Sequence, residues 1–69
     1  MSQARVYEIL QFLGGEATTK AIREEAYKRY PSLTLHTYVT NRLKKLEKYG
    51  VVERSESDKG VSWKILREL

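Results

Sequence analysis

Polar side chains of the kinds that contact nucleic acids gather between residues 34 and 49. A helix turns about 100° per residue, so four of them share one face and two flank it: Thr37, Asn41, Lys44 and Lys48, with Thr40 and Lys45. An asparagine amide can pair with adenine, a threonine can contact either base type, and lysines can meet phosphates. Thr and Asn are weaker helix formers than the Glu, Gln and Lys of an ordinary solvated face. We therefore expect this face to contact DNA.

The same stretch contains the signals of a helix that can present this face. Apolar residues recur at helical spacing on the opposite side: Leu35, Val39, Leu43 and Leu46. Thr34 is a suitable N-cap, and Gly50 can end the helix because glycine readily adopts the left-handed conformation. These signals predict a recognition helix over residues 34–49, with its apolar side in a core.

Four further residues extend the candidate DNA surface. His36 lies near the start of the predicted helix, where it could contact a phosphate or a base, or be solvated. Lys20 lies in the first turn of another predicted helix, where a cation opposes the helix dipole unless an anion is close. Arg54 and Lys59 lie on a predicted hairpin and could reach the DNA backbone. The three acids between residues 53 and 58 would be repelled by that backbone, so a purely structural hairpin is equally expected.

Two more helices are predicted before the recognition helix. The first covers residues 3–13, with its apolar stripe in the core, and ends at Gly14-Gly15. The second covers residues 19–30, is capped by Thr18 or Thr19, and ends because the residue before Pro31 is disfavoured in the helical conformation.

The remaining pattern predicts a hairpin with strands at residues 51–54 and 61–66, joined by a polar loop. Apolar residues alternate with polar ones along the second strand, as a strand with one buried face requires. Of the hairpin residues, Trp63 should contribute most to the core. Residues 16–19 could add a brief strand to this hairpin.

The order helix, helix, turn, helix, two-stranded hairpin resembles the winged helix-turn-helix fold, an α+β class, over nearly the whole chain. The run Leu46-Glu47-Lys48-Tyr49-Gly50-Val51-Val52 is similar to the helix end that leads into the wing of MarR-like and PadR-like regulators. The stretch KRYPSLTLHTYVTNRLKKLE is similar to the DNA-binding half of ferric uptake regulators. The metal-binding half and histidine clusters of that last family have no counterpart here, so the resemblance implies a winged-helix domain over residues 1–69 without metal sensing.

The composition of the chain restricts the classes of function that it can have. The 69 residues carry a net charge of +4, which fits a nucleic-acid partner, and no cysteine. A single histidine, no glycine-rich phosphate loop and no inward pair of carboxylates argue against an enzyme, a metal site or a cofactor. The start MSQARVYEIL lacks the basic segment and apolar run of a signal peptide, so we expect a cytoplasmic chain.

The sequence therefore predicts a small transcriptional regulator that inserts its third helix in the major groove of double-stranded DNA. Two alternatives remain open: a winged-helix module that docks onto a larger protein complex, and a non-specific nucleic-acid binder. Four aromatic side chains exceed what so small a core hides easily: Tyr7, Phe12, Tyr27 and Tyr49. Two interpretations remain open, namely ordinary half-buried side chains and a homodimer interface through the first helix.

Overall fold

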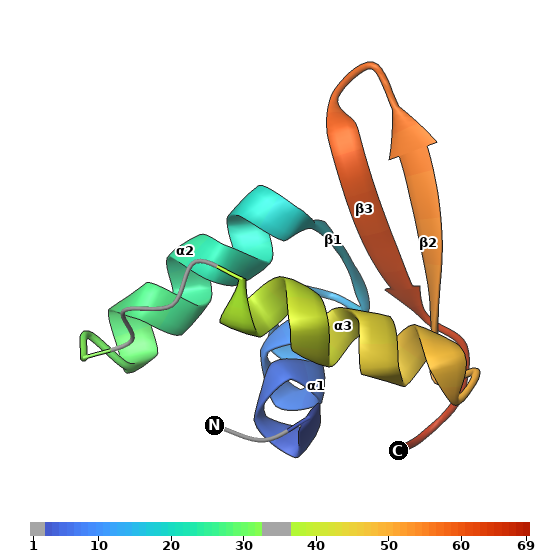
Figure 1. The fold of residues 1–69 in the computed structure, drawn as a ribbon. Coiled ribbons are helices and arrows are strands. Elements are labelled where there is room, and N and C mark those ends of the chain that lie inside the picture. Colours follow the sequence, from blue (N-terminus) through green and yellow to red (C-terminus); the bar gives the residue numbers. More distant parts are fainter. Residues whose placement is uncertain (1–2, 33–36) are drawn as a thin grey trace.

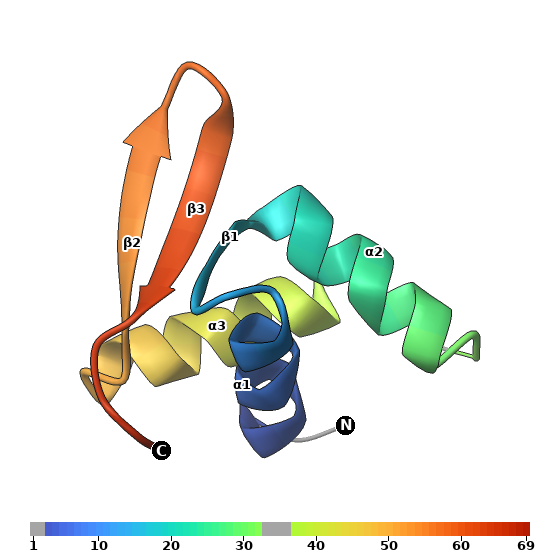
Figure 2. The same ribbon diagram turned by 180° about the vertical axis from the view of Figure 1, so that it is seen from behind.

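Six helices and strands make up the computed structural model, which describes residues 3–32 and 37–69 (Figure 1). In chain order they are α1 (Gln3–Phe12), β1 (Glu16–Thr18), α2 (Thr19–Arg29), α3 (Tyr38–Lys48), β2 (Val52–Ser57) and β3 (Gly60–Ile65). The three helices pack together, and the β2–β3 hairpin projects beyond them (Figures 1 and 2). The predicted Thr34 cap, Leu35 and His36 lie outside the described residues.

The apolar stripe of α1 is buried as predicted, at Val6, Ile9 and Leu10. The helix ends at Phe12, one residue before the predicted end, although the Leu13 amide still donates to the Ile9 carbonyl at 3.0 Å. The pair of glycines that follows reverses the chain toward β1.

Thr18, one of the two predicted caps, is the N-cap of α2. Its side chain accepts a hydrogen bond from the Ala21 amide at 3.1 Å, which satisfies a donor of the first turn. The helix buries Ile22 and Ala26 and ends at Arg29, one residue before the predicted end at Tyr30.

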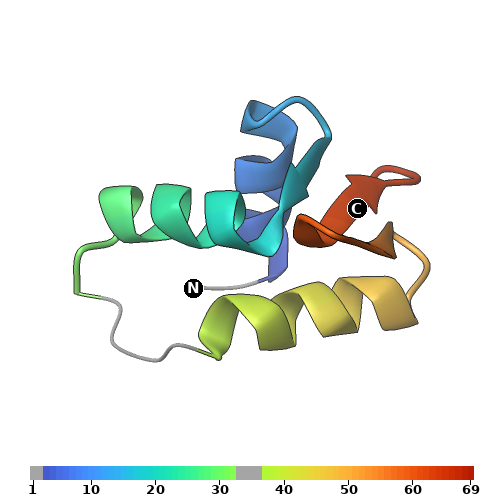
Figure 3. The ribbon, with the colours of Figure 1, turned by 90° about the horizontal axis from the view of Figure 1, so that it is seen from above.

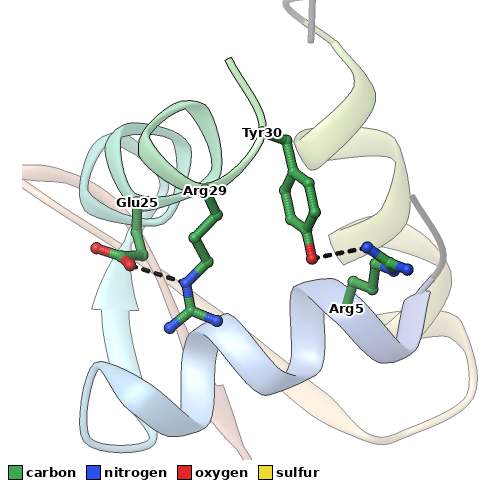
Figure 4. Close-up of polar contacts among 4 residues, drawn as sticks. All are labelled: Arg5, Glu25, Arg29 and Tyr30. Carbon is green, nitrogen blue, oxygen red and sulfur yellow. Dashed lines mark hydrogen bonds and ion pairs between the residues drawn. The ribbon is translucent and has the colours of Figure 1, made fainter. Parts of the chain in front are cut away.

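Figure 4 shows how the end of α2 is joined to α1. Arg5 of α1 donates from Nη1 to the Tyr30 hydroxyl at 2.9 Å, and its guanidinium lies 5.2 Å from the centre of the Tyr30 ring. Arg29 forms an ion pair with Glu25 at 2.8 Å and lies over the ring of Phe12. The arginine contacts fix the two helices to each other at their polar borders.

The third helix, α3, buries Val39, Leu43 and Leu46, as its spacing predicts. Its described part is shorter than the predicted 34–49, because it begins at Tyr38 and ends at Lys48. The end is a Schellman motif: Gly50 has φ +73°, its amide donates to the Glu47 carbonyl, and the Val51 amide donates to the Leu46 carbonyl.

The strands form an antiparallel sheet in the order β1-β3-β2, and β1 confirms the brief strand expected before α2. The predicted hairpin bounds of 51–54 and 61–66 are wrong. β2 continues to Ser57, which pairs with Gly60, so only Asp58 and Lys59 form the turn. A polar sequence can extend as a ribbon here because most of β2 needs no buried face, and Gly60 takes the positive φ of +110° that the turn requires.

The core lies between the helices and one face of the sheet. Trp63 is 2 % exposed and packs with the buried residues of all three helices, which confirms its predicted role. Together these features give the chain an α+β, winged-helix-like fold. No helix within the described ranges is both long enough and apolar enough to span a membrane.

Candidate nucleic-acid interface

The predicted contact face of α3 lies at the surface. Its members are exposed except for the half-buried Thr40: Thr37, Asn41, Lys44, Lys45 and Lys48. In Figure 1 this helix lies in front of α1, and in Figure 2 it lies behind. Thr37 was predicted to lie inside the helix, but it immediately precedes α3.

A hollow of about 310 Å³ lies beside α3, where α2 and the hairpin approach it. Figure 3 shows the ribbons of these elements from above. We call it the three-cation hollow. Seven residues from four elements line it: Thr19 and Arg23 of α2, Thr40 and Lys44 of α3, Arg54 of β2, and Val61 and Trp63 of β3. The hollow thus lies between α2, α3 and the hairpin.

The charge of the hollow is all of one sign. Arg23, Lys44 and Arg54 contribute three cations from three separate elements, and none of the lining residues is acidic. Arg54 is directed there by the strand register, because it pairs with Trp63 and so shares the sheet face that meets the helices. A site with these features favours an anion.

Arg23 and Thr19 were missed by the sequence analysis. Nε of Arg23 is enclosed and has no hydrogen-bond partner among the described residues, so what Arg23 brings to the hollow is the charge of its guanidinium group. The two residues are four positions apart and therefore share a face of α2. That spacing was a usable signal, but only the packing shows that this face meets the hairpin.

Thr19 also fixes the floor of the hollow. Its hydroxyl accepts a hydrogen bond from Nε1 of Trp63 at 2.8 Å and donates to the Val61 carbonyl at 3.3 Å. The first residue of α2 is thereby bound to β3, which holds the wing at a defined position relative to the helices.

Glu47 forms an ion pair with one cation of the hollow. Its Oε2 lies 3.7 Å from Nε of Arg54, and the two side chains are 38 % and 43 % exposed. By helical spacing Glu47 lies on the side of Lys44 that faces the hairpin, whereas Lys45 lies on the other side. The contact is long and solvated, so it weakens the positive charge of Arg54 without removing it.

The acids of the wing are divided between its two faces. Glu53 pairs across the strands with Lys64 and, with Glu16, lines a separate hollow of about 190 Å³ on the opposite face of the sheet. Glu56 shares the face of Arg54, farther along toward the turn. Of these two acids of the wing, one is therefore directed away from the three-cation hollow and does not oppose a DNA contact there.

The outlying candidates are less closely grouped. Lys20 is exposed in the first turn of α2, and Lys59 is exposed in the turn at the tip of the hairpin. Neither lines the three-cation hollow. Of the ten predicted contact residues, the structure brings Thr40, Lys44 and Arg54 together in it.

No group of three or more His, Cys, Asp or Glu side chains in the described part of the chain is arranged to hold a metal ion.

Comparisons with protein-family models, with curated proteins and with solved structures found no match to this chain. The function of the chain is therefore inferred from its fold and from the chemistry of this surface.

Proposed function

We propose that this chain is a small cytoplasmic transcriptional regulator that binds double-stranded DNA, with α3 in the major groove. The observation that carries the proposal is the convergence of Arg23, Lys44 and Arg54 on one hollow beside α3 that has no acidic lining residue. Cations from three elements at the border of an exposed polar helix suit a phosphate backbone beside a groove.

Roles follow from side-chain chemistry and position. Asn41 reads adenine through its amide, and Thr37 and Thr40 contact base edges or thymine methyl groups. Lys44, Lys45 and Lys48 bind phosphates and so determine affinity more than sequence preference. Lys20 and Lys59 contact the DNA backbone on either side of the groove.

The test is the affinity of a fluorescently labelled duplex of random sequence, measured by anisotropy over a series of salt concentrations. We expect Arg23→Gln to weaken binding to every duplex and to reduce the slope of log K against log salt by about 0.9, the value for one lost phosphate contact. Lys28→Gln is the matched control, because Lys28 is an exposed cation on the same helix and does not line the hollow.

Absence of duplex binding at physiological salt would overturn the proposal. Equal effects of the two substitutions would show instead that only net charge matters and that the hollow makes no contact of its own.

A second candidate, docking onto a partner protein, is favoured by one specific observation. Tyr49, Leu66 and Leu69 are between 53 % and 61 % exposed near the end of α3 and the C-terminal segment. Arg67 joins these segments by donating to the Tyr49 carbonyl at 2.6 Å. Exposed apolar side chains of this kind suit a protein interface. If the duplex does not bind, docking onto a partner protein becomes the leading proposal.

A further inference from the structure

The outer edge of β2 is unpaired. β2 is an edge strand in the order β1-β3-β2, and no other described strand pairs with its far side (Figures 1 and 2). Each of its six residues from Val52 to Ser57 has one partner on β3, so no bulge interrupts the strand. A regular edge of this length presents free N–H and C=O groups to another strand.

We propose that β2 pairs antiparallel with β2 of a second copy of this chain, about a two-fold axis that passes through Ser55. In this register Arg54 of each copy lies directly opposite Glu56 of the other. Both residues lie on the sheet face that carries Trp63, because they pair with Trp63 and Val61 on β3. The self-pairing therefore forms two cross-strand pairs of opposite charge.

Alternative registers centred on residues 53–57 are disfavoured by the same charges. The two-fold axis that relates two antiparallel strands lies between the two copies of one residue, which face each other across it. It cannot lie between two different residues, because side chains opposite each other must point to the same face of the sheet. An axis through Glu53, Arg54 or Glu56 would set that charge opposite its own copy.

An axis through Ser57 would set Glu56 opposite Asp58, which are both acidic. Among positions 53–57, Ser55 is consequently the centre that leaves no like charges directly opposite each other. This self-complementarity identifies the occupant of the edge as a second copy of the chain.

The geometry of the pair follows from its symmetry. A two-fold axis perpendicular to the sheet keeps the same face of both copies on the same side. Because the helices pack against the Trp63 face, the helices of both copies lie on one side of a continuous sheet of six strands. The dimer is thus formed by the wing and leaves α1 outside the interface.

Sedimentation equilibrium without nucleic acid tests the pairing. An interface made by one strand edge is small and therefore weak, so the series extends to roughly 1 mM chain. We expect the wild-type mass to rise from 8.1 kDa toward twice that value. Arg54→Glu and Glu56→Arg each turn both attractive pairs into repulsive ones and should weaken self-association roughly tenfold or more.

The decisive sample is an equal mixture of the two single variants. The Arg54→Glu chain carries an acid at both paired positions, and the Glu56→Arg chain carries an arginine at both. Each variant repels its own copy but attracts the other, so the mixture should form a heterodimer with wild-type affinity. Lys28→Glu, a charge reversal on α2, should leave self-association unchanged, and Trp63 fluorescence confirms that every variant is folded.

A wild-type mass that stays at 8.1 kDa over the whole series would overturn the proposal. Dimerisation that ignores both charge reversals would overturn it as well and would point to another surface, such as the exposed Phe12 on α1. Because no nucleic acid is present, either result is independent of the proposed DNA binding.

Discussion

Arg54 has neighbours of both charges, with opposite consequences for an anionic ligand. It faces the three-cation hollow with Arg23 and Lys44, where its charge adds to theirs, and it lies 3.7 Å from Glu47, where its charge is partly balanced. An exposed pair of this length contributes little to stability. Glu47 therefore matters through the charge that it removes from the hollow.

Replacing Glu47 by glutamine should strengthen DNA binding. The substitution keeps the shape of the side chain and removes the competing carboxylate, so duplex affinity at low salt should rise roughly two- to fivefold, the equivalent of one exposed ion pair. Anisotropy titration measures the change. Glu24→Gln alters net charge equally from an exposed site on α2, and a gain no larger than in that control would contradict the assigned role.

Single residues were predictable from sequence only where they belonged to a periodic face. Lys44 follows from the polar side of α3, and Arg54 from its place on the hairpin. Arg23 was missed because α2 has only two fully buried positions, so its sequence does not determine which of its sides meets the wing. The packing of α2 against β3 decides that, through contacts far apart in the chain.

At the scale of elements, one hydrogen-bonded residue connects the wing to the helices. Thr19 binds both the Trp63 indole and the Val61 carbonyl, so α2 and β3 are joined at the floor of the hollow. Figure 3 shows the start of α2 beside the hairpin. We expect the position of the wing to depend on this hydroxyl.

Thr19→Val should destabilise the fold. It keeps the volume and branching of the side chain but leaves the indole N–H of the buried Trp63 without its partner, which costs about 1–3 kcal/mol. Urea unfolding, followed by the fluorescence of the single tryptophan, measures the loss. Thr19→Ser retains the hydroxyl and should retain most of the stability; equal losses in both variants would refute the hydrogen bond as the cause.

The elements themselves were largely predictable, because their signals are local. Gly14 and Gly50 mark helix ends, and Thr18 caps α2 through its own side chain. The length of the wing was not predictable in this way. A solvated ribbon pairs through its backbone, so residues 55–57 join β2 without the apolar alternation from which a strand is inferred.

At the scale of the whole molecule, the net charge of +4 understates the positive character of one side. The strand register directs Glu53 to the sheet face opposite Arg54, and Glu16 lies on that same far face. The cations of α2, α3 and β2 instead meet at the three-cation hollow. Sequence alone yields the sum of the charges, whereas their division between the two faces requires the register.

The most direct test of DNA binding through this side is an amide NMR titration of the full chain with a random-sequence duplex and then with duplexes enriched by binding selection. We expect shifts at Thr37, Asn41 and Lys44 and at Arg23 and Arg54, with tighter binding to the selected duplex. Asn41→Ala should weaken the selected complex by roughly tenfold, since a base contact is lost, and the random complex little.

Shifts confined to Tyr49 and Leu66, or no shifts with any duplex, would contradict DNA binding by this surface and favour a protein partner.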